Sequence, residues 1–458
     1  MRVIICGAGQ VGYGIAERLS AENHDVTVID IEARLVEKIR DTLDVRGFVG
    51  HGSRPEVLLA AGADEADMLI AVTLFDEVNM VACQVAHSLF NIPTKIARIR
   101  SQSYLEPFYK TLFARENIPI DVVISPEVEV GEMVLRRIAL PGAIDVLYFC
   151  NDDIVALALE CMEDCPVINT PLRQLTELFP DLQTTVTAIK RGSELLIAHS
   201  DTQLCVGDVI YLVAARDQVR RALVIFGHKD QNAHRIIIAG GGHIGLYVAQ
   251  AIEKRLHKLR LKIIESSRER ASVIADQLEK TTVLYGNVLD PIILQESGID
   301  QADLMITLTN QDQVNLLSAI IAKRLGCKAN MVLINNVAYQ EFSRAVGVDA
   351  YLNPRSVTVS KILQQMRRGR IRAVHSVFNG NAEIIEAEVM QTSSLVGKSL
   401  SELNLSNGLR IGALYRNKKI IPLLADIRIL PGDRVVIFAL ADSVREVEQL
   451  FRVSLEYF

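Results

Sequence analysis

The chain has 458 residues, of which 49% are hydrophobic and 23% charged, a composition typical of folded globular domains and unlike that of disordered chains. Lys and Arg total 49 and Asp and Glu total 55, so the net charge is −6, which argues against a sequence-independent nucleic-acid binder and against direct adsorption to an anionic membrane. The seven cysteines are odd in number and scattered, which argues against a disulfide framework or a zinc site and for a reducing cytosolic setting. At roughly 150 residues per domain, length alone suggests about three domains.

The N-terminal residues do not show the pattern of a cleavable signal peptide, because Arg2 is followed at once by a short apolar run that ends in glycines. The stretch 236–252 contains 17 residues without Asp, Glu, Lys or Arg. It is short for a membrane span, and three consecutive glycines interrupt it. We therefore expect a strand, a tight turn and a helix in this stretch.

The two halves of the chain repeat each other. Residues 2–30 and 235–265 both read as a basic residue, a short apolar run, three small turn residues, an amphipathic helix and a second apolar run that ends in an acid. Residues 51–79 match residues 287–315 at an offset of 287 − 51 = 236; within them, Gly62, Ala66, Asp67, Thr73, Asp76 and Asn79 recur as Gly298, Ala302, Asp303, Thr309, Asp312 and Asn315. Identities at this density indicate a tandem duplication of a unit of about 230 residues.

In chain order, the first half begins with short apolar strands that alternate with helical patterns. The strands are expected at 2–6, 26–30, 46–49, 68–73 and 95–100. This alternation predicts βαβ units and a parallel sheet that is covered by helices on both faces. A connector helix over 127–140 follows and stops at a Pro-Gly pair.

The region after this connector changes in character. It has turn signals, a helix expected at 171–179, and a Gly-Asp turn that enters a β-branched strand within 204–214. The second half repeats the order, with a connector helix at 355–368, a helix at 399–404 and the matching strand within 429–439. The predicted fold class is α/β, with two Rossmann-like doubly wound parallel-sheet lobes that are each followed by a small α+β lobe; the predicted lobes are 1–124, 143–227, 232–352 and 370–453.

A basic cluster ends the second connector helix. We interpret Arg367, Arg368 and Arg370 as a solvated helix end that complements its own dipole. Contact with an acidic partner is the alternative.

Each half carries a glycine-rich turn between its first strand and first helix. Gly7, Gly9 and Gly12 have the spacing GxGxxG, and Gly240, Gly242 and Gly245 repeat it. The first glycine permits the tight turn, the second lets the backbone approach a pyrophosphate, and the third lets helix and strand pack closely. The helix N-terminus then offers N–H groups and a positive dipole end to the anion.

An acid ends the second strand of each half, Asp30 in the first and Glu265 in the second. A carboxylate at this place can accept two hydrogen bonds from a ribose diol and repels a 2′-phosphate. The pattern favours NAD(H) or an adenine nucleotide over NADP(H). The alternative is an acid that only caps a loop.

Further polar residues gather at the carboxyl ends of the later strands. Thr73 and Thr309 end the fourth strands, and Asp76 begins the next helix either as a ligand contact or as an N-cap. The fifth strand of the first half carries Arg98 and Arg100 on one face, whereas 331–339 has no arginine. Since arginine is suited to phosphate recognition, we expect the first site to bind more phosphate charge than the second. Either the first site binds ATP or ADP and the second binds NAD(H), or the two sites bind the same ligand strongly and weakly. Surface salt bridges are the alternative role of these arginines.

The sequence contains no arrangement that we expect to be catalytic. His51 and His243 lie in or near the loops, where a histidine more often hydrogen-bonds locally than catalyses. No GxSxG, P-loop or HExxH motif is present, and no metal site is expected.

Taken in order, these motifs resemble a known family. The glycine turn, the acid after strand two, GADEADMLIAVT, the DExxN helix start and the VGDVIYLV strand are similar to an RCK (KTN) unit, a regulator of potassium conductance. Two such units in one chain resemble the TrkA family, the regulatory subunits of Trk-type potassium-uptake systems. The resemblance covers residues 1–453.

The resemblance implies a peripheral protein on the cytoplasmic face of the inner membrane that binds NAD/NADH and ATP/ADP and gates an integral-membrane Trk-type potassium transporter. It also implies a homotetramer, since rings of single units contain eight nucleotide lobes. The implied cofactor contacts are Gly7, Ala8, Gly9, Gln10, Val11, Gly12, Asp30, Thr73, Leu74, Arg98, Arg100, Gly240, Gly241, Gly242, His243, Ile244, Gly245, Glu265 and Thr309. An NAD-dependent dehydrogenase with tandem Rossmann domains is the alternative function, although no proton-transfer residue stands out for it.

Overall fold

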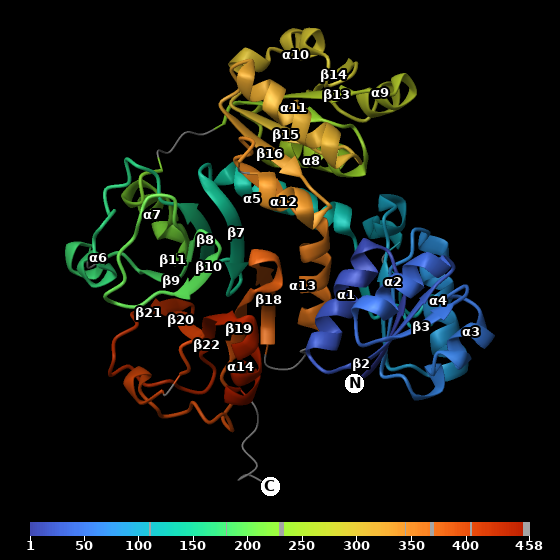
Figure 1. The fold of residues 1–458 in the computed structure, drawn as a ribbon, viewed down its shortest axis with the longest axis horizontal. Helices are drawn as coiled ribbons and strands as arrows, with labels where there is room; N and C mark the ends of the chain where they lie inside the picture. The colour runs from blue at the N-terminus through green and yellow to red at the C-terminus, as the bar shows by residue number, and fades with distance from the viewer. Residues whose placement is uncertain are drawn as a thin grey trace. The chain divides into compact units, whose positions relative to one another are not determined.

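The computed structural model describes residues 1–109, 111–179, 181–228, 233–343, 345–366, 371–403 and 405–451 (Figure 1). Two compact units form: Met1–Glu129 with Asn353–Met366, and Val130–Leu352 with Arg367–Phe458. Arg367, Arg368 and Arg370 lie outside the described residues, so the interpretation of that basic cluster stays a prediction.

The first unit contains the first nucleotide-type lobe, a six-stranded parallel sheet. Its strands are β1 (Arg2–Cys6), β2 (Asp25–Asp30), β3 (Arg46–Val49), β4 (Met68–Ala71), β5 (Thr94–Arg98) and β6 (Val122–Ile124), in the order β3-β2-β1-β4-β5-β6. Its main helices are α1 (Gln10–Ala21), α2 (Ala33–Thr42), α3 (Pro55–Ala60) and α4 (Asp76–Phe90). This is the Rossmann strand order, with the switch point between β1 and β4. All four residues of β4 are buried, as expected for a strand that helices cover on both faces.

The first unit also takes in the connector helix of the second half, α13 (Pro354–Met366), which lies alongside α1 (Figure 1). The Arg355 guanidinium lies over the Tyr13 ring, 5.5 Å from its centroid, and pairs with Glu17. A Cβ on Gly14 would lie 2.2 Å from Arg355 Nε, so glycine lets the arginine lie flat on α1.

The second unit contains the second nucleotide-type lobe, which repeats the first. Its strands are β12 (Arg235–Ala239), β13 (Arg260–Glu265), β14 (Thr282–Tyr285), β15 (Leu304–Thr307), β16 (Ala329–Leu333) and β17 (Ala350–Leu352), in the order β14-β13-β12-β15-β16-β17. Its helices are α8 (His243–Arg255), α9 (Arg268–Ala275), α10 (Pro291–Ser297), α11 (Asp312–Arg324) and α12 (Val337–Ser343).

The connector helix of the first half, α5 (Pro126–Ala139), packs against this second lobe from residue 130 onward. Val130 and Val134 join the core of the second lobe, together with Val248 of α8. The Tyr247 hydroxyl donates a hydrogen bond to Glu132 at 2.6 Å. The glycine-turn helix of each lobe is therefore held by the connector helix of the other half.

The two small lobes are five-stranded antiparallel sheets within the second unit. The first has β7 (Ala143–Phe149), β8 (Ile154–Glu160), β9 (Thr184–Arg191), β10 (Glu194–Ile197) and β11 (Val209–Ala215), with α6 (Leu172–Leu178) and α7 (Val219–Ile225). The second has β18 (Ile371–Val377), β19 (Ala382–Glu388), β20 (Leu409–Arg416), β21 (Lys419–Ile421) and β22 (Arg434–Leu440), with α14 (Val444–Leu450). One apolar core joins both sheets and includes Phe149, Tyr211, Val377 and Phe438.

The predicted fold class is confirmed, with two parallel-sheet lobes and two small antiparallel lobes. In the range 399–404, where a helix is expected, the structure has a short 3-10 helix, Leu400–Glu402, with a capping box between Ser399 and Glu402. In each Gly-Asp turn the aspartate is buried and pairs with a partly exposed arginine, Asp208 with Arg191 and Asp433 with Arg416.

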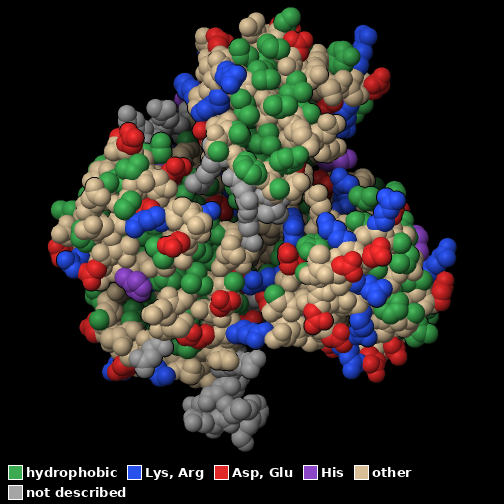
Figure 2. All heavy atoms as spheres, viewed as in Figure 1, with side chains coloured by type: hydrophobic (Ala, Val, Ile, Leu, Met, Phe, Trp, Pro, Cys, Tyr) green, Lys and Arg blue, Asp and Glu red, His purple; other side chains and the backbone are tan. Residues whose placement is uncertain are grey.

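None of the described helices is both long enough and apolar enough to cross a membrane. Acidic and basic side chains are interspersed over the surface of the described residues on the face that Figure 2 shows.

Candidate functional site

The glycine turn of the first lobe contains three glycines, and the local structure differs at each of them. Gly7 has φ of 114°, a conformation that L side chains rarely adopt. A Cβ on Gly12 would lie 1.8 Å from the Gly7 carbonyl oxygen, so the close approach of strand and helix requires a glycine. Gly9 has extended backbone with φ of −64°, and a Cβ there would meet no described atom within 4 Å. The protein itself therefore gives no reason for glycine at 9, whereas a ligand that approaches the backbone does.

The second lobe repeats this geometry. Gly240 has φ of 103°, and a Cβ on Gly245 would lie 2.0 Å from the Gly240 carbonyl oxygen. Gly242, like Gly9, has φ of −64° and open space in front of it among the described atoms. Both lobes thus have open space at the second glycine of the turn, which no described atom fills.

The helices behind these turns begin without a side-chain cap. Gly9 is the N-cap of α1 and Gly242 is the N-cap of α8, neither turn places an acid in the first helical turn, and Gln10 and His243 are the first helical residues. The N–H groups of a first turn have no partner within their helix and carry partial positive charge. An anion in the open room before each helix would accept hydrogen bonds from them.

The acids at the ends of β2 and β13 hold the glycine turns in place. Asp30 accepts hydrogen bonds from Ala8 N at 2.6 Å and Glu32 N at 2.9 Å, one on each oxygen. Glu265 accepts from Gly241 N at 2.7 Å and Ser267 N at 2.8 Å in the same way. The loop-capping role is therefore present. Each carboxylate oxygen keeps a second lone pair with which it can accept a ribose hydroxyl.

The repeated Thr-Asp-Asn residues form a hydrogen-bonded staple rather than a row of ligand contacts. Asn79 is fully buried; its oxygen accepts from Thr73 N and its amide donates to Arg98 O, both at 2.9 Å. Asn315 repeats these bonds with Thr309 N and Leu333 O. The staple fixes the distance between the ends of neighbouring strands.

Asp76 belongs to the same staple, and its N-cap interpretation is wrong. Phe75 is the N-cap of α4, and the Asp76 carboxylate accepts from Arg100 N at 3.0 Å and Ser101 N at 2.9 Å. Asp312 binds the backbone N–H groups of residues 335 and 336 in the same manner.

The arginines predicted for the first site lie at this edge. The Arg98 Nη2 donates to Thr73 O at 3.0 Å, while Arg98 Nε is buried without a hydrogen-bond partner among the described atoms. Burial and the neighbouring Arg100 charge lower the pKa of Arg98. Arg100 Nε donates to Glu127 Oε1 at 2.8 Å. In the second lobe the equivalent hydrogen bonds of Asn315 and Asp312 go to the backbone of Leu333 and Asn335. Leu333 is therefore the counterpart of Arg98, and Asn335 is the counterpart of Arg100.

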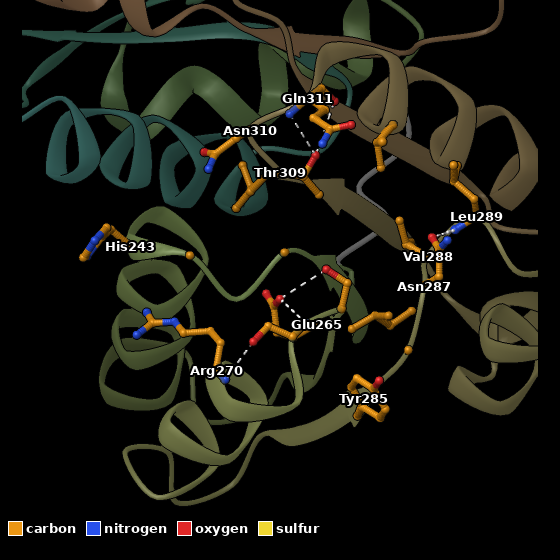
Figure 3. A pocket seen from close by; sticks show the side chains of 18 residues that line it. His243, Glu265, Arg270, Tyr285, Asn287, Val288, Leu289, Thr309, Asn310 and Gln311 are labelled. Carbon is orange, nitrogen blue, oxygen red and sulfur yellow. Dashed lines mark hydrogen bonds between the residues drawn. The ribbon is translucent and has the colours of Figure 1, made fainter. Parts of the chain in front are cut away.

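The second lobe has a cavity of about 1010 Å³ in front of its glycine turn. Figure 3 shows Arg270 and Tyr285 on either side of Glu265, with Thr309 and Gln311 across the cavity. Arg270 Nε donates to Gly241 O at 2.8 Å. Arg270 was not predicted from the sequence, because it does not recur in the first half: it is the third residue of α9, and the third residue of α2 is Leu35.

The remaining residues implied by the resemblance lie around these features. Val11 with Gly12 and Ile244 with Gly245 belong to the first turns of α1 and α8. Leu74 is 71% exposed just beyond β4. His51 Nδ1 lies 2.8 Å from Ser53 Oγ, a local hydrogen bond.

Comparison with known proteins matches family models over most of the chain. The TrkA-N domain model matches residues 3–126 and 236–354, and the TrkA-C domain model matches residues 158–227 and 384–452. Each model thus occurs twice, in the order of the four lobes.

Similar whole chains carry one name. The Trk system potassium uptake protein TrkA of Azorhizobium caulinodans is 55% identical over 458 residues, which is 100% of each chain. The protein of the same name from Halomonas elongata is 39% identical over 462 residues, again 100% of each chain.

Solved structures with the same fold include the crystal structure of the GsuK RCK domain, with a TM-score of 0.62 and 16% identity over 98% of this chain and 94% of that one. The GsuK channel bound to NAD matches with a TM-score of 0.61 and 16% identity over 98% of this chain and 78% of that one. At this identity the likeness concerns the fold alone.

Proposed function

The chain belongs to the TrkA family of Trk system potassium uptake proteins, and from this premise we propose that it is a non-enzymatic nucleotide sensor that gates a Trk-type potassium transporter of the inner membrane. The observation that carries the proposal is the open room at Gly9 and Gly242, in front of two uncapped helix N-termini. This room suits the pyrophosphate of a nucleotide, and the acid that ends the second strand of each lobe suits its ribose.

The proposed ligands are NAD(H) and ATP or ADP. Solved GsuK structures with the same fold are named for bound NAD and bound ADP, the latter with a TM-score of 0.50, which supports both classes. We assign ATP or ADP to the first lobe, because Arg98 and Arg100 place two guanidinium groups beyond its glycine turn. We assign NAD(H) to the second lobe, because Leu333 and Asn335 remove that charge and fit an uncharged far end of the ligand.

Ligand binding would act on the small lobes through the connector helices. The glycine turn of the first lobe opens α1, on which α13 packs, and α13 precedes the second small lobe in the chain. The second turn opens α8, on which α5 packs, and α5 precedes the first small lobe. A nucleotide shifts such a two-state arrangement only by its differential affinity for the two states.

The proposed partner is an integral-membrane Trk-type transporter subunit that the protein meets at the cytoplasmic face. The name of the relatives, Trk system potassium uptake protein, supports this assignment. Four copies of a tandem chain would supply a ring of eight nucleotide lobes, so we propose a homotetramer.

A thermal-shift panel with NAD, NADH, ADP, ATP and NADP tests the ligands, since a ligand that binds only the native state must raise its stability. We expect stabilisation by NAD(H) and by ADP or ATP, and a weaker effect of NADP. The absence of a shift with every nucleotide would contradict the proposal.

Nicotinamide turnover by the purified protein with a panel of alcohols and acids separates the sensor from the dehydrogenase alternative. We expect none, and sustained hydride transfer would overturn the sensor function. Co-purification from bacterial membranes should recover a potassium transporter.

A further inference from the structure

We propose that the residues at which each connector helix crosses a glycine-turn helix determine the choice of partner: each connector helix fits the nucleotide lobe of the other half and rejects the lobe of its own half. The exchange of α5 and α13 then joins unlike halves and excludes the pairing of like halves from two copies of the chain. This inference goes beyond the proposed function and does not depend on nucleotide binding.

At the first crossing, where α13 packs on α1, the lobe contributes a glycine and the connector contributes the large side chains. Gly14 is the fifth residue of α1, and a Cβ on it would lie 2.2 Å from Nε of Arg355, the second residue of α13. Val359 follows Arg355 by four residues, so it lies on the same face of α13, and it is buried. The connector thus fills the space that the glycine of the lobe leaves open.

At the second crossing, where α5 packs on α8, the sizes are reversed. Tyr247 is the fifth residue of α8 and so corresponds to Gly14 of α1. Gly131 is the sixth residue of α5 and so corresponds to Val359 of α13. A Cβ on Gly131 would lie 2.3 Å from Tyr247 Cδ1, so the ring lies directly against the backbone of α5. Here the lobe contributes the large side chain and the connector contributes the glycine.

The charges at the two crossings are reversed as well. The connector α13 supplies a cation, because Arg355 pairs with Glu17 of α1. The connector α5 supplies an anion, because Arg255 Nη1 of α8 donates to both carboxylate oxygens of Glu132, at 2.8 and 2.9 Å. The Tyr247 hydroxyl donates to the same carboxylate at 2.6 Å. Size and charge therefore both distinguish the two crossings.

A pair of like second halves would set α13 against α8, and the side chains would collide. Val359 would meet Tyr247 at the place where even a lone Cβ comes too close. Ser360, the seventh residue of α13, would take the place of Glu132 and leave Arg255 without its carboxylate. Overpacking and a lost ion pair both oppose this pairing.

A pair of like first halves would set α5 against α1, and the side chains would leave a gap. Gly131 would lie opposite Gly14, so neither helix would fill the space between them. Glu132 would lie toward Glu22, the residue of the first half at the place where α8 has its arginine, and Arg18 already pairs with Glu22. The acid would thus exchange a guanidinium partner for a carboxylate.

Glycine at a helix crossing has a plainer role, because it lets two backbones approach closely whatever the partner is. That role requires a glycine at each crossing, but it does not require the glycine to change sides between the lobe and the connector. The reversal of size together with charge is what the plainer role leaves unexplained.

The second crossing allows the selection to be measured within the full chain. The lobe variant, Tyr247→Gly with Arg255→Glu, gives α8 the residues of α1 and so presents α5 with the surface of its own half. The connector variant, Gly131→Val with Glu132→Ser, gives α5 the residues of α13. These two variants, the combined variant with all four changes and the native protein are compared by hydrogen–deuterium exchange in the peptides of α5 and α8 and by thermal unfolding.

We expect the lobe variant and the connector variant each to lose protection in α5 and α8 and to lower the melting temperature by roughly 5 °C, the usual result of a poorly matched contact. The combined variant should recover at least half of both losses, because it rebuilds at the second crossing the size match of the first. Exchange in α1 should stay unchanged in all of them, since α1 belongs to the other compact unit.

Losses that simply add in the combined variant would overturn the inference, because close packing without selection predicts that result. Val134→Ala is the matched control: it removes a buried side chain of α5 from the same core without changing the sizes at Gly131 and Tyr247. Its loss should add to that of the lobe variant, and a recovery there would also overturn the inference.

A charge reversal that adds no bulk at Gly131 covers the case in which the connector variant does not fold. Glu132→Arg should lower the protection of α8, and Arg255→Glu in the same chain should restore it. If the reversed pair protects α8 no better than Glu132→Arg alone, charge does not contribute to the choice of partner and the inference fails.

Discussion

The two nucleotide lobes share the parts that hold the backbone and differ in the parts that face open space. Both have the same strand order, the same glycine geometry, an acid that binds the glycine turn, and the buried asparagine staple. At the edge beyond the turn, the first lobe has Arg98 and Arg100 where the second has Leu333 and Asn335. Beside the acid, the second lobe has Arg270 where the first has Leu35.

The contrast between the shared and the differing residues follows from the free energy that a substitution costs at each place. A change in the staple leaves buried N–H and C=O groups unpaired, which is unfavourable in either lobe. A change at the rim of the site affects only what binds there. The two lobes therefore keep one common backbone frame and differ in the residues at the rim of the site.

The largest expected effect tests the shared frame. Replacing Asn79 or Asn315 by alanine removes the groups that satisfy a buried N–H and two carbonyls, and should destabilise the affected lobe by about 3 kcal/mol. Hydrogen–deuterium exchange should rise in peptides of that lobe and not in the other. Each variant is the control of the other, and clearly unequal losses would show that the two staples are not equivalent.

The second effect tests the open room before the helices. Gly9→Asp and Gly242→Asp each place a good N-cap with favourable dipole charge in a position that has space for it. The ligand-free melting temperature should hold or rise, whereas the affected lobe should lose its ligand stabilisation, about 2.7 kcal/mol at a hundredfold excess over Kd. Gly9→Asn is the control without the negative charge. If Gly9→Asp still bound nucleotide in the first lobe, the nucleotide would not lie in the space before α1.

The sequence predicted the repeated frame well because its signals are local. The glycine spacing, the acids after β2 and β13, and five strands of the first sheet appear in the structure where periodicity places them, while β6, with only three residues, was missed. The exchange of α5 and α13 between the halves was not predicted, since nothing in an amphipathic pattern says which surface a helix covers. The contacts of Glu127 and Arg270 were missed for the same reason: they are made to neighbours that are distant in the sequence.

The third effect tests the difference between the two lobes at the end of β5, where the first lobe has Arg98 and the second has Leu333. Arg98→Leu gives the first lobe the residue of the second and should weaken ATP by about 1.5 to 2 kcal/mol, the usual value of a hydrogen bond to a charged group. NAD should weaken much less, and ligand-free stability should not fall, because the buried guanidinium has an unpaired Nε. Calorimetric titration with both ligands measures the ratio, and an equal loss of ATP and NAD would show that Arg98 does not distinguish them.

The smallest expected effect concerns the other end of the second site. The Arg270 Nε donates to Gly241 O, and the guanidinium lies beside Glu265 at the cavity wall, where an adenine ring would follow the ribose. An arginine over an aromatic face contributes about 0.5 to 1 kcal/mol at a partly exposed site. Arg270→Leu, which copies Leu35, should therefore weaken NAD in the second lobe about three- to fivefold. The loss in NADP affinity should be larger, because the variant also removes a cation that offsets the repulsion between Glu265 and a 2′-phosphate. Titrations are made in the Gly9→Asp protein, so that only the second lobe binds nucleotide. Arg270→Lys separates the contribution of the positive charge from that of stacking. If Arg270→Lys restores NADP binding but not NAD binding, the charge of the side chain acts on the 2′-phosphate and its planar guanidinium stacks on the adenine.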